Sequence, residues 1–246
     1  MLIAALLAAS MTVGPRPSQA MIPAGTFQPL YAEMGRERVH VAAFRIDREP
    51  VTRAAFERFV RQNPSWRRSA VANTMAESGY LADWRNDVDA GTDDRRPVTD
   101  VSWFAANAYC EWRGARLPTL NEWEYVAAAS STKRDASHDA AHLASLVATY
   151  SARAGHPVGA IGDSRPNAFG VSDLHELVWE WTSGFDGSSA HGTHTDAAHD
   201  HRASCASAAL DATTTTDYAA FLRNAFRAGL TKRSTARSLG FRCASN

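Results

Sequence analysis

The segment 96–129, RPVTDVSWFAANAYCEWRGARLPTLNEWEYVAAA, constrains the fold more than any other part of the sequence, because it contains the start signals of two helices. Ser102 follows an extended Pro-Val-Thr-Asp-Val run, so its hydroxyl can cap a first helix that ends at Gly114. Thr119 and Glu122 have the spacing of a capping box, which begins a second helix. The segment therefore predicts two short helices with defined ends.

The first predicted helix needs a core to pack against, and the composition supplies one. Helical periodicity gives it an apolar face of Phe104, Ala105, Ala108, Tyr109 and Trp112. The 246-residue chain is 45% hydrophobic with seven Trp and ten Phe, so it can bury a sizeable core. Its 26 basic and 26 acidic residues balance and no face is obviously basic, so nucleic acid is not an expected partner.

The rest of the chain is predicted to complete one domain with many loops. Short paired strands are expected over 21–27 and 39–46, and Thr52 is expected to cap a helix that ends before Pro64. We predict irregular structure over 65–95, a weak surface helix within 130–154, a structured segment at 171–182, a long polar loop over 184–207 and a strand-like end near 243.

Residues 1–20 differ from the chain that follows them. An apolar run from Leu2 to Val13 precedes the small-residue sequence Ser18-Gln19-Ala20, which is typical of a secretory signal peptide and its cleavage site, although a basic start is missing. A frayed apolar terminus, or a true start at Met21, is the alternative. We predict a signal peptide over 1–20, a domain over 21–246, and a periplasmic or secreted protein without a further membrane-spanning segment.

Four segments of the sequence form a recognisable set: Val101-Ser-Trp through Glu122-Trp-Glu-Tyr, Pro166-Asn-Ala-Phe-Gly-Val, Val178-Trp-Glu-Trp-Thr and Leu239-Gly-Phe-Arg-Cys. In order and spacing they together resemble the formylglycine-generating enzyme, or sulfatase-modifying factor, family. The resemblance implies a C-type-lectin-like α+β domain with little regular secondary structure, two helices packed on small twisted sheets, and long loops. It also implies a disulfide between Cys110 and Cys243, which leaves Cys205 as the odd thiol.

Two departures from the family pattern bear on its chemistry. The generating enzymes hold copper(I) with two cysteines near the C-terminal segment, whereas 206–242 contains no cysteine, so the usual formylglycine-generating activity is not expected here. A family calcium loop is changed as well, because Leu177 has no side-chain oxygen to offer a hard cation, and calcium is doubtful there. Glu180 in that loop could ligate a cation or stabilise the loop through a hydrogen bond.

A more specific likeness concerns the partner. Segments 63–69, 173–181 and 218–227 resemble NirV-type proteins, family members encoded beside copper nitrite reductases and thought to be exported accessory factors. We therefore expect an accessory or maturation factor for a periplasmic copper nitrite reductase. The alternative is a metal- and oxygen-dependent enzyme that modifies a protein or a small molecule with a different ligand set.

Candidate site residues are few, and each also has a structural interpretation. Imidazole and thiolate suit copper or zinc, but the densest set of such groups has no defined metal spacing and is equally typical of a solvated loop. Cys205 could be a reactive thiol, His175 could be a base or a structural hydrogen-bonding group, and Arg223, Arg227 and Arg242 could bind an anion or pair with Glu122, Glu124 and Glu180. The metal candidates are His191, His194, His199, His201 and Cys205.

Overall fold

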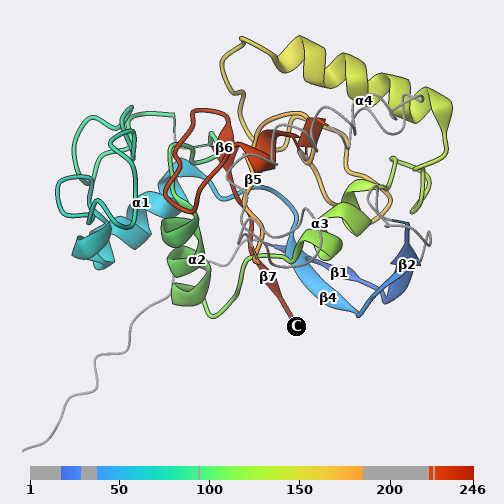
Figure 1. The fold of residues 1–246 in the computed structure, drawn as a ribbon, viewed down its shortest axis with the longest axis horizontal. Helices are drawn as coiled ribbons and strands as arrows, with labels where there is room; N and C mark the ends of the chain where they lie inside the picture. The colour runs from blue at the N-terminus through green and yellow to red at the C-terminus, as the bar shows by residue number, and fades with distance from the viewer. Residues whose placement is uncertain (1–17, 29–37, 94, 185–221, 224) are drawn as a thin grey trace, which may run out of the picture.

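The computed structural model describes residues 18–28, 38–93, 95–184, 222–223 and 225–246, and its regular elements are short (Figure 1). Most of the described chain lies in turns and loops between them, so the expected α+β class with little regular secondary structure is confirmed. The elements are β1 Gln19–Ile22, β2 Gly25–Phe27, β3 Val39–Val41, β4 Phe44–Asp47, α1 Arg53–Gln62, the 3-10 turn Pro64–Trp66, α2 Trp103–Trp112, α3 Leu120–Ala127, α4 Ala140–Arg153, β5 Trp179–Glu180, β6 Leu239–Gly240 and β7 Ala244–Ser245.

Small sheets join distant parts of the sequence. β1, β4 and β7 form an antiparallel sheet with β4 in the middle, β2 pairs antiparallel with β3, and β5 pairs parallel with β6. The two expected N-terminal strands are present, but each is split into two strands. β1 includes two residues ahead of Met21: Gln19 lies opposite Asp47 of β4, and Ala20 is buried.

Both predicted helix starts in the central segment are confirmed. Ser102 accepts a hydrogen bond from the Ala105 N–H at 3.2 Å, and Thr119 and Glu122 form the reciprocal capping box of α3. The buried face of α2 differs from the prediction, because Phe104 is only half-buried. The helix instead buries Ala105, Ala106, Tyr109 and Cys110. Its buried face is thus shifted by about one residue from the predicted face, and it is turned toward the C-terminal segment.

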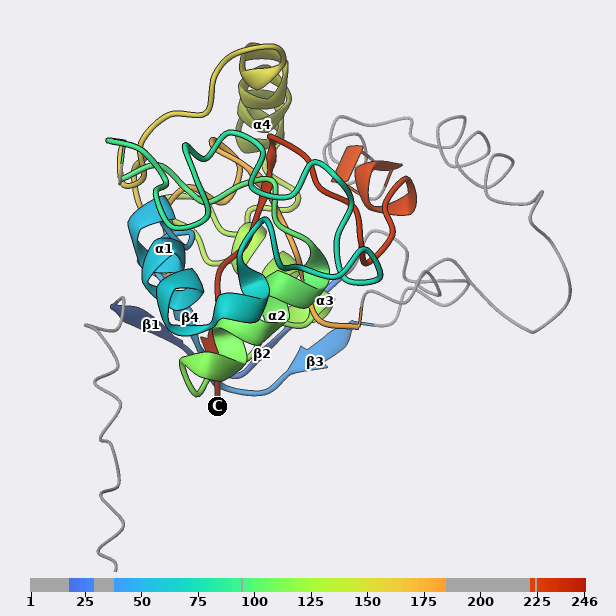
Figure 2. The same ribbon diagram turned by 90° about the vertical axis from the view of Figure 1, so that its left-hand side faces the viewer.

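The C-terminal segment passes through the centre of the core (Figures 1 and 2). Phe241 is fully buried against Phe56 of α1 and Tyr109 of α2, with ring centroids 6.0 and 5.4 Å apart. Cys243 forms a disulfide with Cys110, which confirms the pairing that the family resemblance implied. A second core cluster packs β1–β4 against α3.

α4 lies at the opposite end of the molecule from the β1–β4–β7 sheet (Figures 1 and 2). The predicted weak helix is therefore present, but it is more than a surface element. Its Leu143, Leu146 and Tyr150 are buried, with Trp179 packed against them. None of the described helices has the length and apolar character needed to cross a bilayer.

Candidate functional site

The described residues form a small pocket between β5, β6 and the helical residues 222–223 and 225–228. The parallel pairing of β5 with β6 brings the Val-Trp-Glu-Trp segment beside the C-terminal segment. Aromatic and aliphatic side chains make up most of the wall. The lining residues are Trp123, Trp179, Glu180, Trp181, Thr182, Arg223, Phe226, Arg227, Leu230 and Leu239.

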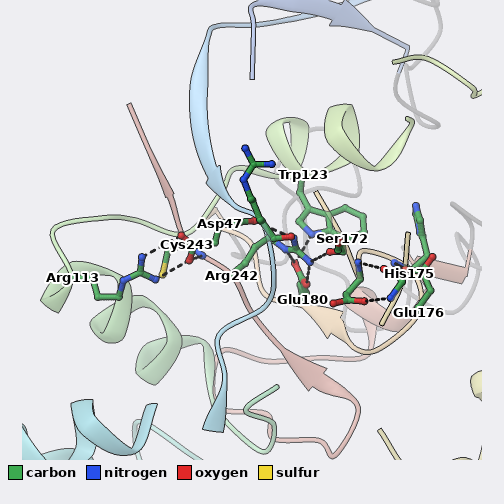
Figure 3. Close-up of polar contacts among 12 residues, drawn as sticks. Asp47, Arg113, Trp123, Ser172, His175, Glu176, Glu180, Arg242 and Cys243 are labelled. Atoms are coloured by element: carbon green, nitrogen blue, oxygen red, sulfur yellow. Dashed lines mark hydrogen bonds and ion pairs between the residues drawn. The ribbon is translucent and has the colours of Figure 1, made fainter. Parts of the chain in front are cut away.

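Glu180, which lines this pocket, forms a buried ion pair with Arg242. Figure 3 shows the pair and the groups around it. Arg242 donates from Nε and Nη2 to the two carboxylate oxygens of Glu180, at 2.7 and 2.8 Å, and both side chains have no exposed surface. The Trp123 indole N–H donates to Glu180 Oε2 at 2.7 Å, and Arg242 also donates to the Ser172 carbonyl at 3.0 Å. Both oxygens of Glu180 are therefore engaged, so this loop is a poor fit for a calcium ion, as Leu177 also indicates.

A second charged group lies beside the first. Glu124 accepts two hydrogen bonds from Arg223, at 2.7 and 3.1 Å, and one from Arg227 at 3.0 Å. Burial alone would raise the pKa of Glu124, but the guanidinium groups of Arg223 and Arg227 outweigh it and hold that pKa at about 2. Both guanidinium groups also lie over the Trp123 ring, at 5.8 and 5.6 Å from its centroid.

A directed chain of hydrogen bonds runs from Arg223 to His175. The Ala127 carbonyl, 3.0 Å from His175 Nε2, can only accept, so Nε2 carries the proton and Nδ1 is an acceptor. The Tyr150 hydroxyl, 2.7 Å away, therefore donates to Nδ1 and accepts from Arg223 Nη1 at 3.2 Å. Burial, with the Arg223 charge, lowers the pKa of His175 to about 3, so this imidazole is neutral at ordinary pH.

Stacked groups form the outer wall of the pocket around Trp179. The ring centroid of Phe226 lies 5.0 Å from that of Trp179 in a stacked arrangement, and the Tyr150 centroid lies 5.2 Å away. The Arg153 guanidinium lies 4.3 Å from the Trp179 ring centroid and donates to the His175 carbonyl at 3.1 Å. α4 thus supplies two residues, Tyr150 and Arg153, to the support of the pocket.

The predicted site residues fall in three different places. Arg227 lines the pocket, whereas His175 is buried beneath it with both ring nitrogens hydrogen-bonded, as the structural interpretation anticipated. The arginines pair with Glu124 and Glu180, but Glu122 pairs with Arg116 instead. The remaining candidates lie outside the described residues: His191, His194, His199, His201 and Cys205.

The residues present do not fit the two-cysteine copper site of the generating enzymes. Cys110 and Cys243 are joined in the disulfide, and Cys205 is the remaining cysteine of the chain. Among the described residues, no group of three or more His, Cys, Asp or Glu side chains is arranged to hold a metal ion.

Several residues that line or support the pocket were missed by reasoning from sequence. Phe226 and Leu230 line it, and Tyr150 and Arg153 pack against Trp179 behind it. All four lie in segments that look polar or weakly helical, so nothing local marks them as site residues. The spacing of Leu143, Leu146 and Tyr150, at positions i, i+3 and i+7, is a helical apolar face and could have indicated that α4 packs inward.

Comparison with protein families agrees with this architecture. A family model described as "Sulfatase-modifying factor enzyme 1-like domain" matches residues 5–246. The chain belongs to the sulfatase-modifying factor family. Its fold is therefore the family's C-type-lectin-like fold, as expected from the four sequence segments.

Relatives within this family have different activities. Inactive C-alpha-formylglycine-generating enzyme 2 of Mus musculus is 29% identical over 94% of this chain and 86% of that protein. Hercynine oxygenase of Mycolicibacterium smegmatis is 34% identical over 59% of this chain, which spans 38% of that protein's length. Treponema denticola variable protein 1 has a similar fold, with a TM-score of 0.50 and 17% identity over 92% of this chain and 94% of that one.

Proposed function

We propose that this chain is an exported accessory protein that binds an enzyme through the pocket and helps that enzyme mature, and that the enzyme is a periplasmic copper nitrite reductase. One observation carries the proposal: the carboxylates that line or underlie the pocket are already paired with arginines, whereas aromatic and aliphatic side chains make up most of its wall. Such a surface suits binding better than proton transfer, because the carboxylate oxygens of Glu124 and Glu180 are already engaged by arginines.

Two further observations support a role without formylglycine-generating chemistry. The sequence has no cysteine over 206–242, where the generating enzymes have their copper ligands. The relative that aligns with 94% of this chain is named as inactive, so this fold can be kept in the absence of that activity. The nitrite reductase as partner rests on the NirV-like segments 63–69, 173–181 and 218–227.

Deleting the gene in the producing organism tests this proposal. We expect the exported nitrite reductase to lose copper content and activity, and expect both to return when the wild-type chain is supplied. A Trp179→Ala variant should restore neither, because it removes the centre of the aromatic wall, whereas Met75→Ala, at an exposed position outside the pocket, should restore both. A deletion strain with unchanged copper content and nitrite reductase activity would overturn the proposal.

A second candidate function is a metal- and oxygen-dependent modifying enzyme. The observation that favours it is the 34% identity to hercynine oxygenase over 59% of this chain. Metal analysis of the purified protein distinguishes the two. Copper or iron bound in a stoichiometric amount, with consumption of dioxygen, would support the enzyme. Metal content that stays far below one equivalent after reconstitution would exclude it.

A further inference from the structure

The charged groups around the pocket do not balance. Arg223, Arg227 and Arg242 are matched by only two carboxylates, those of Glu124 and Glu180. The neighbouring His175 is neutral at ordinary pH because its pKa lies at about 3. Glu176 is a third carboxylate that acts on this region, through Arg153 and Arg242. With Arg153 counted, four guanidinium groups face three carboxylates among the described residues, so a small surplus of positive charge remains.

Arg153 is the fourth guanidinium of this region. It bonds the His175 carbonyl and stacks on Tyr150 and Trp179, and within the described residues it forms no direct ion pair with a carboxylate. Glu176 and Glu180 act on its charge without contacting it directly. The cation next to Trp179 extends the positive potential along the aromatic wall.

Arg227 is the cation best placed to meet a ligand. It lines the pocket, its side chain is 16% exposed, and it donates to Glu124 from Nη1. The guanidinium has five N–H donors in a planar fork. Apart from the donor that bonds Glu124, these N–H groups have no acceptor among the described residues. Apolar side chains of Phe226 and Leu230 adjoin it in the wall.

We propose that the pocket binds a carboxylate carried on an apolar or aromatic group, with Arg227 as the anchor and Trp179 and Phe226 as the apolar wall. The planar fork of Arg227 matches two carboxylate oxygens, and the stacked rings remove apolar surface of the carrier from water. A cationic ligand would meet the surplus positive charge. Inorganic phosphate would gain nothing from the aromatic wall.

This inference extends the proposed function, because an aspartate or glutamate next to a large apolar residue of the protein partner would supply such a group. A small aromatic acid has the same chemistry. Two pairs of probes distinguish these sources: 3-phenylpropionate with its neutral amide 3-phenylpropanamide, and the peptide Ac-Phe-Glu-NH2 with Ac-Phe-Gln-NH2. In each pair the neutral amide has nearly the same shape as the acid but lacks its negative charge.

The experiment measures binding of each probe to the purified full chain by calorimetry at pH 7. We expect at least one acidic probe to bind at least ten-fold more tightly than its neutral counterpart, and inorganic phosphate to bind more weakly than that acid. Arg227→Gln should abolish the preference for the acid, whereas Arg237→Gln, at an exposed position outside the pocket, should leave it unchanged. Arg227→Lys keeps the charge and should retain part of the preference, so a folding defect of the Gln variant is recognised.

Each outcome decides the proposal. Discrimination within the peptide pair supports a protein ligand, and discrimination only within the 3-phenylpropionate pair supports a small acid. Equal binding of acid and amide, binding of neither probe pair, or an unchanged preference in Arg227→Gln would overturn the inference. If the deletion strain still loses nitrite reductase copper in that case, the proposed function stands while the carboxylate subsite does not.

Discussion

Arg242 and Glu180 form a two-pronged ion pair, with oxygen–nitrogen distances of 2.7 and 2.8 Å, in a place where neither side chain has any exposed surface. The two residues are 62 positions apart in the sequence. Their contact fixes the Val-Trp-Glu-Trp segment on the C-terminal segment, and hence fixes the floor of the pocket. The pair is therefore a structural requirement for the pocket.

Removing one charge from this pair should be costly. Glu180→Gln leaves the Arg242 cation buried without a counter-charge, so we expect the free energy of unfolding to fall by about 3–5 kcal/mol. Glu122→Gln breaks the more exposed pair with Arg116, whose side chain is 34% exposed, and should cost about 1 kcal/mol or less. Urea unfolding followed by tryptophan fluorescence measures both values, and equal losses in the two variants would contradict this account.

His175 should make the protein sensitive to mild acid. Its pKa is lowered to about 3 in the folded state, from 6.5, so the unfolded chain takes up a proton first as the pH falls. Stability is therefore lost as the pH drops below about 6.5, by about 2 kcal/mol at pH 5. His175→Gln keeps an acceptor for Tyr150 and a donor for the Ala127 carbonyl, and should remove most of this loss. Unfolding at pH 7 and pH 5 tests it, with the exposed His138→Gln as a control that should behave like the wild type.

Asp100 should have the opposite pH dependence. It is 5% exposed, its Oδ2 has no hydrogen-bond partner, and burial, aided by the charge of Asp83, raises its pKa to about 6. A raised pKa means that stability present below about pH 4 is lost as the pH rises toward 6. Asn also tolerates the left-handed backbone at φ 55°, so Asp100→Asn should be more stable than the wild type at pH 7 and not at pH 4. A stabilisation equal at both pH values would argue against ionisation as its cause.

The disulfide should be a major source of stability. Cys110 and Cys243 are separated by 133 residues, and closing a loop of that size is worth about 5 kcal/mol in chain-entropy estimates. We expect the variant with both cysteines changed to Ala to lose several kcal/mol in urea unfolding. Titration of the denatured wild type should find one thiol without reductant and three with it. Three thiols without reductant would show that the bond does not form.

The first strand should need residues ahead of Met21. Arg48 N–H donates to the Ser18 carbonyl at 3.1 Å, and the Gln19 side chain bonds Asp47 and Ser245 at 3.1 and 3.0 Å. A chain that starts at Met21 should therefore be less stable by about 2 kcal/mol than one that starts at Ser18. If the protein is exported and processed, N-terminal sequencing should find Ser18 retained. If the two chains are equally stable, residues 18–20 do not stabilise the domain. The structure then gives no reason to expect cleavage upstream of Ser18.

The sequence indicated features that depend on neighbouring residues, and it missed those that depend on distant ones. The capping box of Thr119 and Glu122 needs residues three apart, so it could be recognised directly. The contact of Arg223 with Glu124 joins residues 99 apart, and several acidic partners were equally compatible with each arginine. Tyr150 shows the same limit, because a weakly helical segment gives no indication that Trp179 will pack against it.

The family resemblance supplied what local patterns could not. It predicted the disulfide, which confines Cys243 beside α2 and explains why the C-terminal segment passes through the core. It could not predict the surplus of arginines at the pocket, because that depends on which charges meet in space. The candidate metal loop with His191 and Cys205 stays a prediction, since it lies outside the described residues.

The route of residues 239–245 through the core also sets an order of events during biosynthesis. These residues supply β6, Phe241, the Arg242 guanidinium, the Cys243 sulfur and β7, and the ribosome makes them after every residue that they contact in the described structure. Helices such as α1 and α2 can form early, but the two core clusters cannot close until this segment has been made. The nascent chain therefore stays incompletely folded until residues 239–245 have left the ribosome.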